Sequence, residues 1–73
     1  ISYLVAGLNP EYIGKTLREL NLTRRFGISV IGIQRQQEKI STPGADEKIL
    51  SNDILLVMGK PDDVNRLSLE IEK

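Results

Sequence analysis

Side chains that could carry out chemistry are sparse in this chain. The sequence contains no histidine and no cysteine, so it lacks the commonest general base, the commonest zinc ligand and the thiol nucleophile. Asp62 and Asp63 are adjacent at the start of a predicted helix, so their side chains point in different directions and do not form a metal-binding pair. Their negative charges are stabilised by the positive N-terminal end of the helix dipole. Asp53 falls in a predicted turn. We therefore expect no catalytic residue, no metal site and no enzyme.

Positive charge gathers at one place, where Arg24 and Arg25 follow Lys15 and Arg18 on a predicted helix. One interpretation is a solvated helix end, whose cations complement the C-terminal dipole. The other is an anion site, because guanidinium groups bind phosphates with a fixed fork geometry. Over the whole chain, ten basic residues balance ten acidic ones. A general nucleic-acid binder carries excess positive charge, so we predict no nucleic-acid partner.

The stretch from Gly14 to Arg35 must position this cluster. Ile13, Leu17 and Leu20 are spaced for one face of a helix that ends near residues 21–23. Phe26-Gly27 suits a turn in which Gly27 takes positive φ. The run 28–33 is β-branched and apolar on both faces, with Ile28 and Val30 on one side and Ile31 and Ile33 on the other. We expect a central strand with a helix on one face and a dimer seam on the other.

The rest of the chain supplies short elements around this centre. Residues 2–8 predict a first strand, and residues 10–13 are either a helical turn or a loop. A reverse turn at 36–39 leads to a return strand at 39–41, and Thr42-Pro43-Gly44 breaks regular structure. Residues 49–50 form an apolar plug before the strand 54–59. Pro61 starts a closing helix whose apolar side carries Val64, Leu67 and Ile71.

These elements give the order β-α-β-β-β-α. We predict an α+β fold, a two-layer sandwich in which the helices cover one face of a small mixed or antiparallel sheet. Gly27, Gly32 and Gly44 lack the spacing of a phosphate-binding fingerprint. Gly32 either permits a close approach to the strand or merely tolerates a bulky neighbour.

Seventy-three residues allow one domain, and a chain of this size buries only roughly 60% of its unfolded surface. A small aliphatic core favours dimerisation. The absence of cysteine suits the cytoplasm, and no run approaches the ~20 apolar residues that span a bilayer, so direct membrane insertion is not expected. The chain begins with Ile1, and we interpret residues 1–73 as a single domain cut from a longer protein.

Several segments together resemble a known family. They are residues 14–17, 19–22, 25–28, 33–35, 49–59 and 61–63. In composition and spacing they are similar to the C-terminal domain of regulators of potassium conductance, called RCK-C or TrkA-C. The resemblance covers essentially the whole chain.

This resemblance implies a ligand-sensing module. Members act in the cytoplasm as homodimers, behind a Rossmann dinucleotide-binding domain or attached to potassium channels, potassium uptake systems and cation/proton antiporters. Some bind cyclic di-AMP in the cleft between two subunits. Carried over position by position, that site falls on Leu22, Thr23, Ile28, Ser29 and Pro43.

Two of these positions depart from the binding pattern. Members that bind the nucleotide commonly have arginine where this chain has Thr23, and often asparagine where it has Ser29. Arg24 or Arg25 could replace the missing arginine, and the Ser29 hydroxyl can still donate and accept a hydrogen bond. The resemblance therefore implies a regulatory domain that gates potassium or cation transport through its homodimer, with cyclic di-AMP as a candidate ligand and no other cofactor. The alternative is a passive dimerisation or assembly domain of a transporter or transcription regulator.

Overall fold

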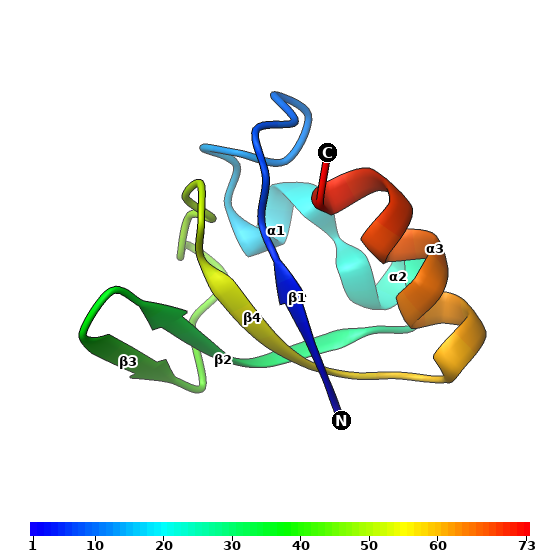
Figure 1. Ribbon diagram of the computed structural model, residues 1–73. Coiled ribbons are helices and arrows are strands. Elements are labelled where there is room, and N and C mark those ends of the chain that lie inside the picture. Colours follow the sequence, from blue (N-terminus) through cyan, green and yellow to red (C-terminus); the bar gives the residue numbers. More distant parts are fainter.

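Four antiparallel strands form one sheet in the order β1-β4-β2-β3. The computed structural model describes all residues from Ile1 to Lys73, and Figure 1 shows their arrangement. The strands are β1 (Ser2–Val5), β2 (Ser29–Arg35), β3 (Glu38–Ser41) and β4 (Ile54–Met58). The helices are α1 (Leu17–Leu20), α2 (Leu22–Phe26) and α3 (Pro61–Ile71). The predicted α+β class is confirmed, with an entirely antiparallel sheet. The element order is as predicted except that two short helices, not one, lie between β1 and β2.

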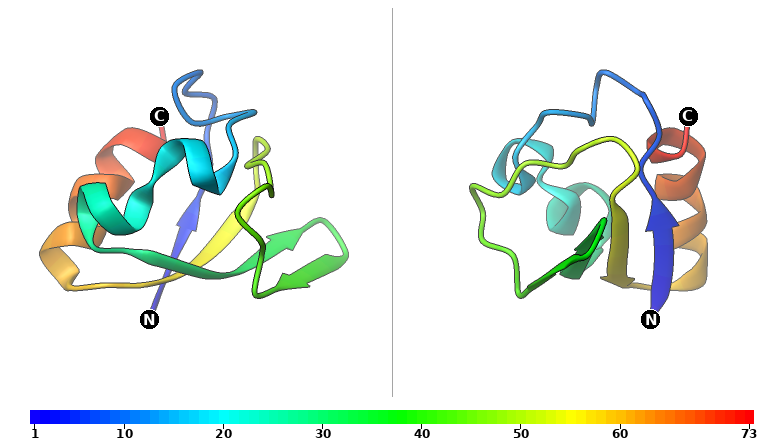
Figure 2. Two further views of the ribbon diagram at one scale, coloured as in Figure 1. Left: turned by 180° about the vertical axis from the view of Figure 1, so that it is seen from behind. Right: turned by 60° about the vertical axis from the view of Figure 1, so that its left-hand side comes forward.

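The helices lie on one face of the sheet, as the two views of Figure 2 show. Between the layers lies an aliphatic core with two aromatic rings, Tyr12 and Phe26. Strands β1, β2 and β4 contribute Leu4, Ile33, Leu55 and Val57, and the helices contribute Leu20, Leu22, Phe26, Val64, Leu67 and Ile71. The predicted two-layer sandwich is therefore confirmed, and α3 buries the three residues expected of it.

The predicted first helix corresponds to α1, which ends at Leu20 with Asn21 as its C-cap, within the predicted end at residues 21–23. The short helix α2 that follows was not predicted. Asn21 takes the left-handed conformation (φ 49°, ψ 51°), which asparagine tolerates better than most residues. Helix α1 begins at Leu17, because Thr16 caps it in a capping box with Glu19. Ile13 therefore lies outside the helix.

Residues 10–14 form turns, in which the Tyr12 and Ile13 N–H groups both donate to the Asn9 carbonyl oxygen (2.9 Å each). The segment is therefore the helical turn of the two alternatives, and Gly14 (φ 84°) separates it from α1.

Strand β2 contains a bulge between Val30 and Gly32. The extra residue changes which side chains share a face. Ile33 belongs to the core, and Val30 packs against that core, so the prediction that Ile33 faces away from Val30 was wrong. An added Cβ at Gly32 would come no closer than 3.6 Å to its neighbours. Gly32 therefore does not permit an unusually close approach.

Strand β1 ends at Val5, earlier than the predicted residue 8. Beyond it the backbone turns toward α3, where the Gly7 N–H donates to the carbonyl oxygen of Ile71 (2.8 Å). Ala6 is fully buried, whereas Leu8 is 76% exposed. The last three residues of the predicted strand 2–8 therefore lie outside β1.

The second face of the sheet carries no further layer within the chain. Tyr3 and Leu56 are paired across β1 and β4 on this face, and Tyr3 is largely exposed. Met58 is half-exposed, and Ile54 and Leu56 are partly covered. No helix has both the length and the apolar character needed to cross a bilayer.

Candidate functional site

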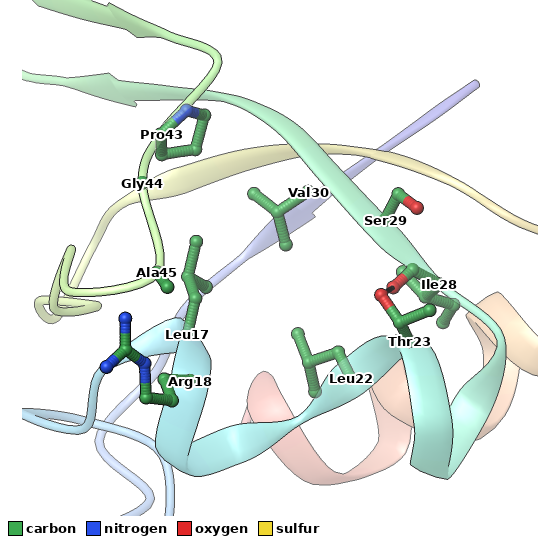
Figure 3. A pocket seen from close by; sticks show the side chains of 10 residues that line it. All are labelled: Leu17, Arg18, Leu22, Thr23, Ile28, Ser29, Val30, Pro43, Gly44 and Ala45. Carbon is green, nitrogen blue, oxygen red and sulfur yellow. Dashed lines mark hydrogen bonds between the residues drawn. The ribbon is translucent and has the colours of Figure 1, made fainter.

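A pocket of about 230 Å³ lies between the two short helices, the beginning of β2 and the loop after β3. Figure 3 shows its lining: helix residues below, the β2 residues above, and the loop at one side. The lining residues are Leu17, Arg18, Leu22, Thr23, Ile28, Ser29, Val30, Pro43, Gly44 and Ala45.

Half of the ten residues that line the pocket are hydrophobic. Leu22 and Ile28 are buried members of the core, so their positions are set by packing. Leu17 and Val30 are partly buried and pack against the same core. Pro43 forms the wall opposite the α2 end of the pocket. Because these groups are fixed by the fold, the apolar surface is present without a ligand.

The corner from α2 into β2 is held by one tight turn. Gly27 has φ 71°, in the left-handed region, and its N–H donates to the Thr23 carbonyl oxygen (2.9 Å), so the predicted positive φ is confirmed. The Thr23 hydroxyl donates to the carbonyl oxygen of Ile28 (3.2 Å). Thr23 and Ile28 are thereby tied across the turn, next to the exposed Ser29.

Backbone hydrogen bonds hold the loop wall against α1. The Arg18 N–H donates to the Ala45 carbonyl oxygen (2.9 Å), and the Leu17 N–H donates to that of Glu47 (3.0 Å). Thr16 and Lys48 form an isolated antiparallel bridge beside them. Pro43, Gly44 and Ala45 therefore keep a defined place at the pocket.

A buried ion pair anchors the far end of this loop. Arg35 donates to both carboxylate oxygens of Asp53, from Nε (3.0 Å) and Nη2 (2.8 Å). Asp53 is 1% exposed and also accepts from the Leu50 N–H (2.8 Å). Hydrogen bonding to Asp53 raises the pKa of the Arg35 guanidinium. Asp53 does sit at a turn, but sequence reasoning missed its partner; the one available signal was an acidic residue directly before a buried strand, which requires compensation.

The two predicted arginines lie away from the pocket. Arg25 donates to the Tyr12 hydroxyl (3.3 Å), stacks over the Phe26 ring (5.1 Å) and pairs with Glu70 (3.8 Å). These contacts bind α2 to α3. Arg24 is exposed, and neither residue lines the pocket. Of the seven predicted site residues, the structure brings together five: Leu22, Thr23, Ile28, Ser29 and Pro43.

Tyr12 and Glu70 link the loop after β1 to α3. The Tyr12 hydroxyl donates to Glu70 Oε1 (2.6 Å), and the Asn9 side chain donates to the Glu70 carbonyl oxygen (2.8 Å). Burial raises the pKa of Tyr12, and its hydrogen bond to Glu70 adds to the rise. This contact is structural and lies outside the pocket. No three acidic side chains gather closely enough to hold a metal ion.

Comparison with known proteins identifies the family. The model for the TrkA-C domain matches residues 1–71. The chain belongs to the TrkA-C family. The resemblance found in the sequence is thereby confirmed.

Two curated relatives are transport proteins of Bacillus subtilis. Ktr system potassium uptake protein C is 35% identical over 63 residues, covering 86% of this chain and 28% of that protein. K(+)/H(+) antiporter subunit KhtT is 39% identical over 56 residues, covering 75% of this chain and 34% of that protein. The TrkA-C domain thus spans about a third or less of each relative.

Two solved structures share the fold closely. The RCK C domain of the potassium transport protein KtrA, solved with cyclic di-AMP, has a TM-score of 0.82 and 27% identity, over 96% of this chain and 82% of that one. The RCK_C domain dimer of Streptococcus agalactiae BusR, also with cyclic di-AMP, has a TM-score of 0.87 and 23% identity, over 96% and 86%. BusR has also been solved with its promoter DNA. A protein that contains this fold can therefore bind DNA, as BusR does, whereas we predicted no nucleic-acid partner for the present chain.

Proposed function

We propose that this TrkA-C domain is the ligand-sensing part of a potassium or cation transport system, and that it binds cyclic di-AMP between two copies of the chain. The observation that carries the proposal is the pocket itself. The five positions transferred from family members that bind this nucleotide all line it, although they come from α2, β2 and the loop after β3.

The known relatives support both parts of the proposal. The KtrA domain holds cyclic di-AMP at 27% identity, and the curated relatives are a potassium uptake protein and an antiporter subunit. A host transport system of this kind would place the domain in the cytoplasm. There it would act with a membrane-embedded transporter part or a Rossmann domain.

The size of the pocket favours a site completed by a second copy. Its volume of about 230 Å³ lies below the roughly 300–1,000 Å³ of sites that enclose a small molecule. Cyclic di-AMP consists of two equal halves related by two-fold symmetry. A two-fold dimer places the same residues on both sides of its axis, so each copy receives one half of the ligand.

The apolar part of the lining suits an adenine base. Leu17, Val30 and Pro43 offer aliphatic surface to the base, and the buried Leu22 and Ile28 support it from the core. The Thr23 hydroxyl already donates to Ile28, so toward a ligand it serves as an acceptor. A ligand held by both copies stabilises the dimer arrangement in which the two subunits lie at the distance that the ligand bridges. Because the ligand binds this arrangement more tightly than any other, it shifts the equilibrium between the conformations of the attached transporter.

Isothermal titration of the purified chain with cyclic di-AMP tests the proposal, with cyclic di-GMP as the control ligand. We expect saturable binding of one cyclic di-AMP per two chains, and light scattering should show a dimer in its presence. Val30→Ala shortens a partly buried side chain of the pocket wall and should weaken binding, whereas Leu69→Ala removes an exposed leucine of α3 (73% exposed) and should leave it unchanged.

A passive assembly domain predicts a different result. In that case the chain is dimeric with and without nucleotide, and cyclic di-AMP produces neither heat nor a shift in melting temperature. This outcome would contradict the sensing proposal and leave assembly as the function.

A further inference from the structure

Arg18 is the single charged residue among those that line the pocket. It stands on α1, and Figure 3 places its guanidinium group beside Ala45, at the end of the pocket away from Thr23. Arg24 and Arg25 do not reach the pocket, and Arg25 is engaged by Tyr12, Phe26 and Glu70.

We infer that Arg18 supplies the cationic contact to a phosphate of the bound nucleotide. This inference rests on the proposed function, because it assigns a role within the same site. A nucleotide phosphodiester is an anion, and a guanidinium group binds it through two parallel hydrogen bonds. In a two-fold dimer each copy supplies one Arg18, so both phosphates of a cyclic dinucleotide are contacted.

The present partner of Arg18 can be exchanged easily. Its Nη2 lies 3.5 Å from Asp46 Oδ1, and the two side chains are 69% and 87% exposed. Ion pairs this exposed contribute little to stability. The backbone of Arg18 is fixed more firmly, because its N–H donates to Ala45 (2.9 Å). The side chain is thus free to turn from Asp46 to a ligand while its base stays at the pocket wall.

The same geometry gives Asp46 a role in tuning affinity. Asp46 follows directly after Ala45 and competes with the ligand phosphate for the Arg18 guanidinium. Its removal frees Arg18 and also removes a negative charge near the bound anion. Asp46→Asn should therefore tighten binding by about twofold.

Titration of three variants of the full chain with cyclic di-AMP tests the inference. Arg18→Gln should weaken binding at least tenfold, which corresponds to about 1.4 kcal/mol, and should flatten the dependence of the dissociation constant on salt. Arg18→Lys keeps the positive charge but loses the two parallel N–H donors of the guanidinium group, so its affinity should lie between that of Arg18→Gln and that of the unaltered chain. Lys15→Gln is the matched control, since Lys15 is an exposed cation of the same segment that does not line the pocket.

The outcomes separate this inference from the proposed function. If the unaltered chain binds and Arg18→Gln binds within twofold of it, the role of Arg18 is refuted while the site stands. If Lys15→Gln loses as much affinity as Arg18→Gln, the effect is general attraction and the specific contact is refuted as well. Failure of the unaltered chain to bind overturns both proposals. Circular dichroism confirms the fold of each variant.

Discussion

Replacing Asp53 by asparagine should destabilise this domain more than any other single charge removal. Asp53 is buried and holds the Arg35 guanidinium through two hydrogen bonds. Removing one partner of a buried pair typically costs about 3–5 kcal/mol, because the other charge remains uncompensated. Arg35 keeps Glu47 (3.3 Å) and the Lys48 carbonyl oxygen (2.9 Å) as partners, and its side chain is 22% exposed. We therefore expect a smaller loss of about 2–3 kcal/mol, after reducing the figure for a fully buried pair.

Urea denaturation followed by circular dichroism measures this loss, since urea leaves ionic interactions unscreened. For a domain of this size, each 1 kcal/mol lowers the melting temperature by about 4–8 °C, so the melting temperature of Asp53→Asn should be lower by roughly 8–24 °C. Asp46→Asn is the control, because its ion pair with Arg18 is exposed and should change stability by less than about 0.5 kcal/mol.

A double-mutant cycle with Arg35→Met identifies the source of the loss. If the pair is coupled as the geometry indicates, the double variant should be more stable than the sum of the single effects predicts. An Asp53→Asn variant within 0.5 kcal/mol of the unaltered chain, or additive effects in the cycle, would refute the interpretation of Arg35 and Asp53 as the anchor of the loop wall.

Three further predictions concern single positions. Thr16→Ala removes the capping box of α1 and should cost about 1 kcal/mol in urea denaturation. Gly27→Ala places a side chain at φ 71° and should cost about 1–2 kcal/mol, whereas Gly44→Ala, with open space around its Cβ, should be close to neutral. In a Tyr3→Phe background, ultraviolet titration should give Tyr12 a pKa above its ordinary value of about 10. Because the pKa of Tyr12 is higher in the folded than in the unfolded chain, the protonated hydroxyl stabilises the fold fully below pH ~10, and this contribution is lost as the pH rises through the folded pKa. A titration midpoint of Tyr12 at or below pH ~10 would contradict this prediction.

The sequence predicted those features of the fold that depend on local patterns. The apolar run of β4 and the acidic first turn after Pro61 are short-range signals, and both led to the correct element. The left-handed Gly27 was predictable because glycine is the residue that most readily takes positive φ in the turn between a helix and a strand.

Features that depend on distant partners were not predictable. The bulge in β2 becomes visible only when the strand is paired with β4, and it reversed the predicted face of Ile33. Asp53 and Arg35 are both common in exposed turns and strand ends, so nothing local showed that they meet. The end of the first helix near Asn21 was predicted correctly, but α2 was missed, because its apolar residues Leu22 and Phe26 are too few to show a helical period without the core that they pack against.

The candidate site was only partly accessible from the sequence. The transferred positions Leu22, Thr23, Ile28, Ser29 and Pro43 came from family resemblance, whereas residue types alone indicated only the positive cluster. Within that cluster, charge could not distinguish Arg25, which packs against α3, from Arg18, which lines the pocket. That distinction depends on where each side chain points, and only the assembled fold provides it.

The position of β1 has a consequence for synthesis on the ribosome. This strand is made first, yet it pairs only with β4, about 50 residues later (Val5 with Ile54), and closure of so long a loop carries an entropic cost. The backbone after β1 also bonds to the end of α3, at Ile71 and Lys73. The β2–β3 hairpin can form as soon as it emerges, whereas β1 waits until nearly the whole domain has left the exit tunnel. The strand made first is thus the last to become part of the sheet.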